Sequence, residues 1–505
     1  MITNDSRKWW VLGALTFGIL AISLDMTILN VALPTLASDL NASTSSLQWI
    51  VASYNLILAA VLLPAGMLGD SYGRKKYLLA SLVLFGLASG GCALSDSTTM
   101  LIVMRCFLGL GAAFIMPLSM SILPVLFHGA ERTKAMMLWA MANMFGIPLG
   151  PILGGWLLKH YSWGSVFLIN IPLVAIALIA VGFLLPESRS ENRQRLDVFG
   201  VITSSLGLTG ITYGVIRTGE HSWSEPMAIS SMVVGLLLLI VFTAWQRRIT
   251  YPLIDLSLFR SARFTWGTIL ATIVTFAIFG LMFAMPQYFQ AVQSADSLQT
   301  GLRLLPLIGG LIIGAKAAQS LLPKMGTKWI AALGFALLAI SLAIGAATHM
   351  DSSYGFAATW ITISGLGLGM ALPTAMDAAL GELSAERSGV GSALIMACRL
   401  VGGSFGVALL GAALNATYRS NIDLTGVPDL AAESVQLSVT AGTAIAKQLG
   451  SEPLLQSVRY AFVSGMDTML WICGGIALIG VVLTLIFLPR GLVASTPDQV
   501  KEIGL

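Results

Sequence analysis

Runs of about 20 apolar residues recur along the whole chain, and they limit the folds that it can adopt. Each run is long enough to cross a hydrocarbon core roughly 30 Å thick as a helix. Only helices and closed barrels satisfy their backbone polar groups inside a bilayer, and these runs lack the period-2 alternation of barrel strands. Of the 505 residues, 56% are hydrophobic and 10% are charged, against about 25% charged in soluble domains. The sequence therefore predicts an all-α polytopic membrane protein.

The distribution of basic residues predicts the orientation of this protein. We count fourteen apolar runs, and an even number places both termini on one side of the membrane. Nineteen of the 28 Lys and Arg residues fall in loops on that side, and six fall in the opposite loops. The positive-inside rule then predicts that both termini are cytoplasmic. The net charge of +4 follows from this asymmetry and does not indicate a nucleic-acid partner. The first run lacks a cleavage pattern, so we expect it to remain as a helix.

Two long polar segments suggest how the runs are grouped. The connector PESRSENRQRLD follows the sixth run and separates an N-terminal six-helix bundle, 1–185, from the rest. Residues 186–264 are predicted to hold this connector and two extra helices, and residues 265–505 a second six-helix bundle. Between the last two runs, 390–414 and 467–488, we expect an external loop, 415–466, of amphipathic structure.

A faint repeat relates the two predicted bundles. GMLGDSYGRKKYL after the second run has an echo in QSLLPKMGTKWIA after the tenth, where Gly73 aligns with Gly326 and Lys75 with Lys328. Many transporters are built from internal repeats around a central site. The echo favours a transporter, although it is weak on its own.

Two charged residues interrupt the apolar runs of the first bundle. Asp25 lies in the middle of ILAISLDMTILNVALP, and Arg105 lies inside the fourth run. A charge at the bilayer centre costs roughly 2.5–3.5 kcal/mol on insertion scales and normally marks a functional site. Poor hydration disfavours the charged form of an acid, so Asp25 is a candidate proton site. The alternative for Arg105 is a side chain that snorkels to the interface.

The segment GMLGDSYGRKK joins the second and third runs. Gly66 and Gly73 permit a tight turn and close helix approach. Asp70 and Arg74 are able to form a charge-assisted clamp at the helix ends. We predict a conformational latch here, and the alternative is a basic loop that serves only to set topology.

The fifth run contains FGIPLGPILGG. Its residues Gly146, Gly150 and Gly154 recur every four positions, which predicts a face for close backbone packing. Pro148 and Pro151 weaken the hydrogen-bond ladder and bend a helix. Together they predict a hinge that rocks against a neighbouring helix.

Other polar residues are weaker candidates. Asp377 is a third candidate for coupling, and its alternative role is an interfacial acid that caps a helix end. Asp467 is expected to begin the last helix as an N-terminal charge. A possible substrate pocket is assigned to Trp49, Tyr54, Asn55, Gln287 and Arg399.

The four motifs together resemble the major facilitator superfamily. LDMTILNVALP, GMLGDSYGRKK, RCFLGLGAA and GIPLGPILGG are similar to that family's ordered signatures. With YSWGSVFLINIP and fourteen runs, they resemble its fourteen-helix drug:proton antiporter branch, particularly QacA-like exporters of quaternary ammonium compounds and dyes. The resemblance implies the major facilitator fold, a proton-handling role for Asp25 and Arg105, a latch at Asp70 and Arg74, and an antiporter hinge at Pro151.

The sequence also departs from that branch. Some of its cation exporters carry acids in the tenth and thirteenth helices, where this chain has Lys316 and Arg399. The departure argues against efficient export of divalent cations and leaves room for neutral or anionic substrates.

These observations lead to one functional hypothesis and one alternative. The chain is expected to be a proton-coupled antiporter that exports lipophilic, cationic drugs, dyes or antiseptics across a bacterial cytoplasmic membrane. The alternative is a secondary transporter of a dedicated metabolite or natural-product antibiotic. We expect no enzymatic activity, metal or cofactor, because no catalytic histidine cluster or phosphate-binding GxxxxGK[ST] loop is present. The expected partners are small lipophilic substrates, protons and the lipid bilayer, with the protein as a monomer.

Overall fold

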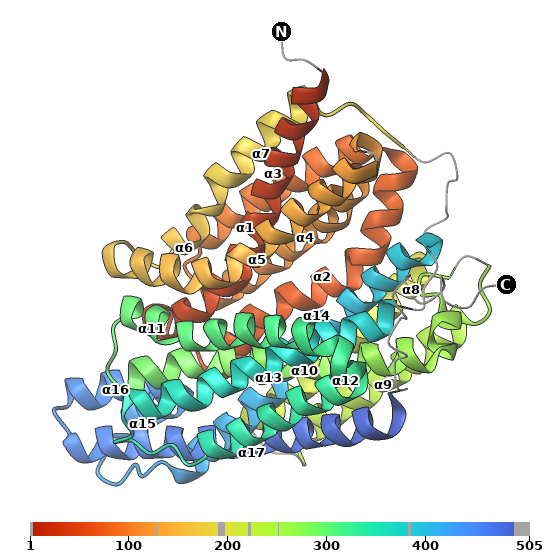
Figure 1. Cartoon of the computed structure of the whole chain (residues 1–505). Helices are drawn as coiled ribbons and strands as arrows, with labels where there is room; N and C mark the ends of the chain where they lie inside the picture. The colour runs from red at the N-terminus through yellow and green to blue at the C-terminus, as the bar shows by residue number, and fades with distance from the viewer. Residues whose placement is uncertain are drawn as a thin grey trace.

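The computed structural model describes residues 4–127, 129–189, 197–220, 224–250, 252–381 and 385–488, and in these residues it is helical without strands. The helices form two halves with an extra pair beside the second (Figure 1). Within the described residues, twelve helices are long and apolar enough to cross a membrane. All four cysteines are free.

The described residues of the first half form seven helices. They are α1 (Asn4–Asp39), α2 (Thr44–Tyr72), α3 (Arg74–Ala93), α4 (Thr98–Leu126), α5 (Gly129–His160), α6 (Ser165–Leu168) and α7 (Asn170–Leu184). Serine side chains cap the starts of two of them: Ser43 accepts a hydrogen bond from the Ser46 amide, and Ser97 accepts one from the Met100 amide. These caps satisfy amides that have no partner inside the helix.

The extra pair is a hairpin of α8 (Val198–Glu220) and α9 (Pro226–Gln246). Asp197 is buried at the start of α8 and closes the hairpin, because it accepts hydrogen bonds from the Gly200 amide, Trp245 Nε1 and Gln246 Nε2. The backbones meet closely where Gly207 and Gly235 face each other. The outer face of α9 is largely apolar and exposed, as expected for a helix that faces lipid.

The second half contains the remaining elements. They are η1 (Leu256–Arg260), α10 (Ala262–Gln287), η2 (Tyr288–Val292), α11 (Ser297–Arg303), α12 (Leu305–Gly345), α13 (Tyr354–Leu380), α14 (Ala385–Asn421), α15 (Asp429–Leu437), α16 (Val439–Gln448) and α17 (Glu452–Phe487). The apolar side chains of this half form one large core that includes Trp360 and Phe335.

The 41-residue α12 folds back on itself at Gly326, whose backbone is non-helical with φ 75° and ψ 161°. Leu311 and Gly334 are both in close contact with the segment of α13 around Gly367. In a straight helix these two residues would lie about 35 Å apart. Two separate segments, 305–323 and 327–345, therefore run alongside α13. They match the predicted tenth and eleventh runs.

The predicted external loop, 415–466, is largely helical. Here α14 continues to Asn421, α17 begins at Glu452, and the short helices α15 and α16 lie between them. The last two helices extend beyond the predicted runs 390–414 and 467–488, because a helix is able to continue past an apolar run where its polar side chains reach water. Asp467 is therefore not an N-terminal charge, since α17 begins fifteen residues before it.

The two halves are joined near α15 and α16, which we call the cap end of the molecule. Thr44 Oγ1 donates to Leu437 O at 3.1 Å, and Gln48 Nε2 donates to Val407 O and Ala408 O. Gln290 Nε2 donates to Val31 O at 3.1 Å. The helices of the two halves diverge from this end toward the opposite end, which carries Asp70 and Arg74 (Figure 1). We call that opposite end the latch end.

Candidate functional site: a buried ion pair in the first half

Asp25 of α1 and Arg105 of α4 form an ion pair inside the first half. Arg105 Nη1 lies 2.5 Å from Asp25 Oδ2, and each side chain is only 1% exposed. The predicted alternative for Arg105, a snorkelling side chain, is wrong because its guanidinium points inward. The pairing explains how the chain accommodates both charges, since each one supplies the partner that the other needs away from water.

Neighbouring helices supply further hydrogen-bond partners for Asp25 and Arg105. Asn170 Nδ2 of α7 donates to Asp25 Oδ1 at 3.3 Å and to Ser89 Oγ at 3.1 Å. Arg105 Nε donates to Ile50 O at 3.1 Å, and its guanidinium lies 4.3 Å from the centre of the Tyr54 ring. The pair thus connects α1, α4 and α7 with α2. Asn170 and Ser89 were not predicted, because uncharged polar residues do not stand out in the sequence of a membrane helix.

The glycines of the predicted hinge pack α5 against α1. A Cβ atom at Gly146 would collide with Ser23, one at Gly150 would collide with Thr27, and one at Gly154 would meet Ile28. Thr27 Oγ1 donates to Gly146 O at 2.9 Å. The close-packing face predicted from these glycines is therefore present.

The same helix reaches the second half at the cap end. Pro151 O faces Gly301 of α11 so closely that a Cβ atom there would collide with it, and Gly155 faces Ser297 O in the same way. Lys159 Nζ lies 3.2 Å from Asp296 Oδ2 and adds an ion pair across this junction. Pro148 lies in α5, but its side chain is outside the described residues.

The predicted latch residues meet at the junction of α2 and α3. Gly73 separates the two helices with φ 128°, a conformation that favours glycine. Arg74 Nε lies 2.6 Å from Asp70 Oδ1. Gly66 approaches Pro117 of α4, which keeps α2 and α4 close.

Glu187, which follows α7, completes this junction and was not predicted. Its carboxylate accepts hydrogen bonds from the amides of Lys75 and Lys76 at the start of α3, and the Arg74 amide donates to Ser188 O at 2.9 Å. A carboxylate at a helix N-terminus is favoured by the helix dipole. The segment after the sixth predicted span therefore ties the latch to the end of α7.

The other predicted candidates do not join the ion pair. Asp377 is exposed on α13, and none of the ion pairs found in the described part of the chain includes it. Gln287 is buried and donates to Phe283 O. Trp49 packs near Tyr213 of α8, at 6.3 Å between ring centres. Asn55 is buried on α2.

Arg399 of α14 lies in the second half, away from the ion pair. Its Nε donates to Thr275 Oγ1 at 3.1 Å, and its Nη1 lies 3.6 Å from Met376 Sδ. The five predicted pocket residues therefore do not form one cluster.

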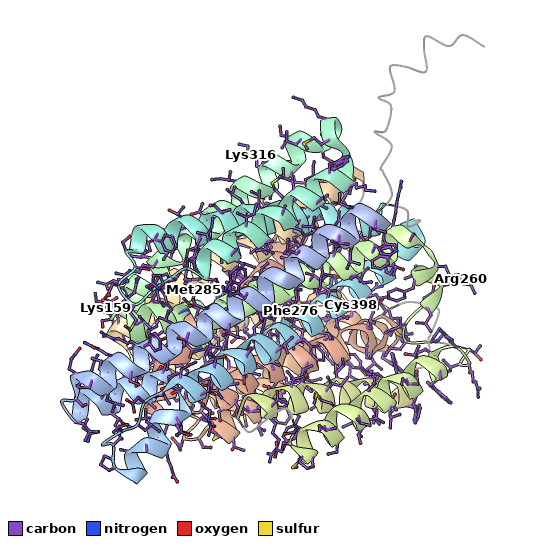
Figure 2. All side chains as sticks on the ribbon, turned by 90° about the horizontal axis from the view of Figure 1, so that it is seen from below. Lys159, Arg260, Phe276, Met285, Lys316 and Cys398 are labelled. Carbon is purple, nitrogen blue, oxygen red and sulfur yellow. The ribbon has the colours of Figure 1, made fainter. Side chains whose placement is uncertain are left out.

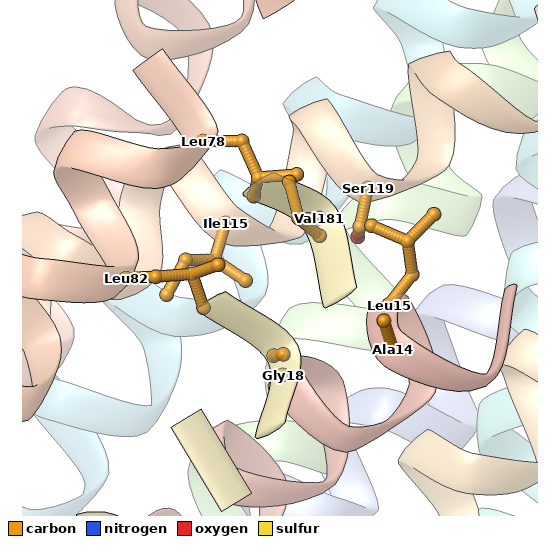
Figure 3. Close-up of a pocket in the computed structure, with 9 residues that line it drawn as sticks. Ala14, Leu15, Gly18, Leu78, Leu82, Ile115, Ser119 and Val181 are labelled. Atoms are coloured by element: carbon orange, nitrogen blue, oxygen red, sulfur yellow. The ribbon is translucent and has the colours of Figure 1, made fainter. Parts of the chain in front are cut away.

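A narrow crevice lies inside the first half, between α1, α3, α4 and α7 (Figure 3). Its lining is apolar except for Ser119, and it has no room for a drug-sized molecule. None of the predicted site residues lines it, so we treat it as a packing defect.

Two helical halves with an ion pair buried in one of them are the architecture of a secondary transporter. Residues 15–407 match the family model of the Major Facilitator Superfamily, and the chain belongs to this family. The resemblance noted in the sequence is thereby confirmed.

Its relatives include drug exporters. The chain is 30% identical to the tetracenomycin C resistance and export protein of Streptomyces glaucescens, over 95% of this chain and 91% of that one. It is 31% identical to the multidrug efflux pump LfrA of Mycolicibacterium smegmatis, over 92% and 93%. The fold is similar to that of a bacterial homologue of the human lysosomal transporter Spinster, with a TM-score of 0.69 and 15% identity over 97% of this chain and 99% of that one.

Proposed function

We propose that this protein is a proton-coupled antiporter that exports lipophilic drugs, dyes or antiseptics across the cell membrane. The observation that carries the proposal is the sealed Asp25–Arg105 pair, in a half that hydrogen bonds of the described residues tie to the other half at the cap end. A buried carboxylate that is able to gain or lose a proton gives such a protein a means of linking proton binding to rearrangement. The drug-exporting relatives support the choice of substrate.

We propose fourteen membrane spans with both termini in the cytoplasm and the cap end outside. Support comes from the twelve candidate spans, the fold-back of α12 at Gly326, and the 32 residues of α5, which would extend about 48 Å as a helix. Segments 1–185 and 265–505 would then be the two bundles, with α8 and α9 as the extra pair between them in sequence.

Protons and substrate do not meet at Asp25 in this mechanism. With a side chain that is 1% exposed, Asp25 has no surface for a drug, so we propose an indirect link between proton and substrate and not a direct competition for one carboxylate. Protonation removes the negative charge that holds Arg105, whose other contacts, Ile50 O and the Tyr54 ring, are on α2. The same helix carries Gln48, which is bonded to α14 of the second half. The proton would thus act on the junction between the halves through α2.

A dedicated natural-product exporter is the second candidate. It is favoured by the relative named for tetracenomycin C resistance and export, which covers nearly the whole chain. Under this candidate the proton chemistry is unchanged, and only the range of substrates is narrower.

The test is efflux of a panel of fluorescent dyes of differing charge, ethidium included, from energised cells. Wild type is compared with Asp25→Asn, with and without a protonophore. We expect efflux that collapses with the protonophore and is lost in the variant at equal expression. Active efflux by Asp25→Asn against a gradient would refute the role of Asp25. Transport of a single compound outside the panel, with no transport of the dyes, would favour the dedicated exporter.

A further inference from the structure

Arg105 and Arg399, which both interrupt apolar runs of the sequence, differ in their partners. Arg105 has a carboxylate, a carbonyl oxygen and an aromatic ring as partners. Arg399 has only a hydroxyl and a thioether, from Thr275 and Met376, among the described residues. A guanidinium offers five N–H donors and stays charged, so most of its binding capacity is unused here.

None of the acids whose side chains the structure describes forms an ion pair with Arg399. Asp377 follows Met376 directly, yet it is exposed and none of the described ion pairs joins it to Arg399. Glu386 belongs to the same helix but lies thirteen residues earlier, about 20 Å along the axis. An arginine this far inside a membrane helix needs a counter-charge or water. A bound anion would supply such a counter-charge.

Arg399 also lies where the two halves meet. Its neighbours on α14, Met396 and Leu400, pack against the apolar core of the first half, and so does Phe279, one turn beyond Thr275 on α10. The guanidinium lies between α10 and α13 beside this seam, and the side chain is partly exposed. A ligand held between the halves would be within its reach.

We propose that Arg399 binds an anionic group of the exported compound, a carboxylate or an ionised phenol. The substrates would then be acidic or zwitterionic aromatic amphiphiles. The inference rests on the proposed export function and names the substrate class that the second half selects. Arginine is suited to this role because its planar fork matches a carboxylate with two parallel hydrogen bonds. Met376 lies against the guanidinium, and Phe279 and Met396, which pack at the seam, would supply further apolar contacts to a ligand.

The proposal changes the expected charge of the substrate. The buried acid of the first half, Asp25, is neutralised by Arg105 and sealed from any ligand, so it offers no site for a cationic substrate. Lys316, an exposed cation of the second half, lies at the edge of the molecule and offers a matched control (Figure 2).

The test compares two dyes that differ in one charge: a rhodamine with a free benzoate and its methyl ester. Binding to the purified full-length protein in phosphatidylcholine nanodiscs is measured by fluorescence anisotropy. We expect wild type to bind the acid more tightly than the ester. Arg399→Gln should weaken acid binding by about tenfold or more, the effect of losing a hydrogen bond between charged groups, and leave the ester unchanged. Arg399→Lys should fall between the two, and Lys316→Gln should match wild type.

Several outcomes would overturn the proposal. Wild type that binds acid and ester equally would do so, and so would an equal loss of both in Arg399→Gln. Phosphatidylglycerol in the nanodisc that displaces the acid dye from wild type, but not from Arg399→Gln, would assign Arg399 to a lipid phosphate instead. If Arg399→Gln does not fold, Thr275→Val is the second variant, because it removes the hydroxyl that orients the guanidinium. It should lower acid affinity selectively, and equal affinity for both dyes would count against the proposal.

Binding needs no proton gradient, so the two proposals fail separately. Acid-selective binding without protonophore-sensitive efflux would refute the export function alone. Protonophore-sensitive efflux without acid selectivity would refute the role of Arg399 alone.

Discussion

At the scale of single residues, the buried pair of Asp25 and Arg105 has the largest expected energetic effect. Removing one partner leaves the other charge buried and uncompensated, which typically costs about 3–5 kcal/mol. We expect Asp25→Asn and Arg105→Gln each to lower the thermal midpoint of the detergent-purified protein. The double variant should lose less stability than the two single variants lose together, because it leaves no lone charge. The midpoints are measured by fluorescence-detected size exclusion after heating. Additive losses in the double variant would show that the two side chains do not depend on each other.

Gly73 is the second residue whose replacement has a clear physical consequence. Its φ of 128° disfavours a side chain, and a Cβ atom would lie 3.1 Å from the Glu187 carboxylate. We expect Gly73→Ala to destabilise the protein by about 1–2 kcal/mol and to slow transport by disturbing the latch. Gly13→Ala is the matched control, since no atom lies within 4 Å of a Cβ atom there. Equal thermal midpoints and transport rates in the two variants would contradict this account.

The charged residues of the site were predictable from the sequence, and their uncharged partners were not. Asp25 and Arg105 stand out because each interrupts an apolar run, although nothing in their spacing shows that they touch. Asn170 and Ser89 carry no charge, so their role emerges only once α3 and α7 lie beside α1. Glu187 belongs to a polar connector in which any acid is unremarkable by sequence, and only the fold brings it to the start of α3.

At the scale of helices, turn chemistry was predictable and helix ends were not. The aligned glycines Gly73 and Gly326 both have positive φ and both end a helix at the corresponding place in each half. The repeat noted in the sequence thus has a physical basis. The ends of α14 and α17 were placed wrongly, because hydropathy measures the apolar run and a helix continues beyond it.

The junction of α5 and α11 leads to a prediction about pH. Asp296 accepts a hydrogen bond from the Gln299 amide at the start of α11, and this bond, with help from Lys159, lowers the pKa of Asp296 below its usual 3.8. Because its pKa is lowered, the Asp296 carboxylate stabilises the closed junction at pH values above the ordinary pKa of aspartate. This stabilisation is lost as the pH falls through the pKa that Asp296 has in the folded protein. The pair should therefore stay intact above about pH 4. External acidity near pH 5–6 should not open the cap end by this route.

The accessibility of a cysteine placed at Ser297 to a membrane-impermeant maleimide measures this opening. In the otherwise unchanged protein we expect slow labelling at pH 6 and at pH 8 alike. Asp296→Asn should increase labelling at both values, because it removes the partner of Lys159. A rise in labelling between pH 8 and pH 6 that persists in Asp296→Asn would show that other groups control the junction.

At the scale of the whole molecule, the sequence predicted two halves but not their arrangement. The apolar runs and the repeat indicate how many helices there are and which ones correspond. Which end is closed depends on contacts between residues hundreds of positions apart, such as Gln48 with Val407, and no local pattern encodes them. The closed cap end is therefore a result of the structure alone.

Alternation between two states requires the cap end to separate, and this gives the last prediction. Lys159 on α5 and Asp296 on α11 face each other across the two halves, so cysteines at both positions joined by a short bis-maleimide should hold the cap end closed. The native cysteines are replaced by serine or alanine first. We expect cross-linking to abolish transport, while each single-cysteine variant treated with the same reagent stays active. The control joins positions 8 and 131, an ion pair within the first half, and should retain transport because that half moves as a unit. Transport by the protein cross-linked between positions 159 and 296 would mean that substrates leave without separation of α5 and α11.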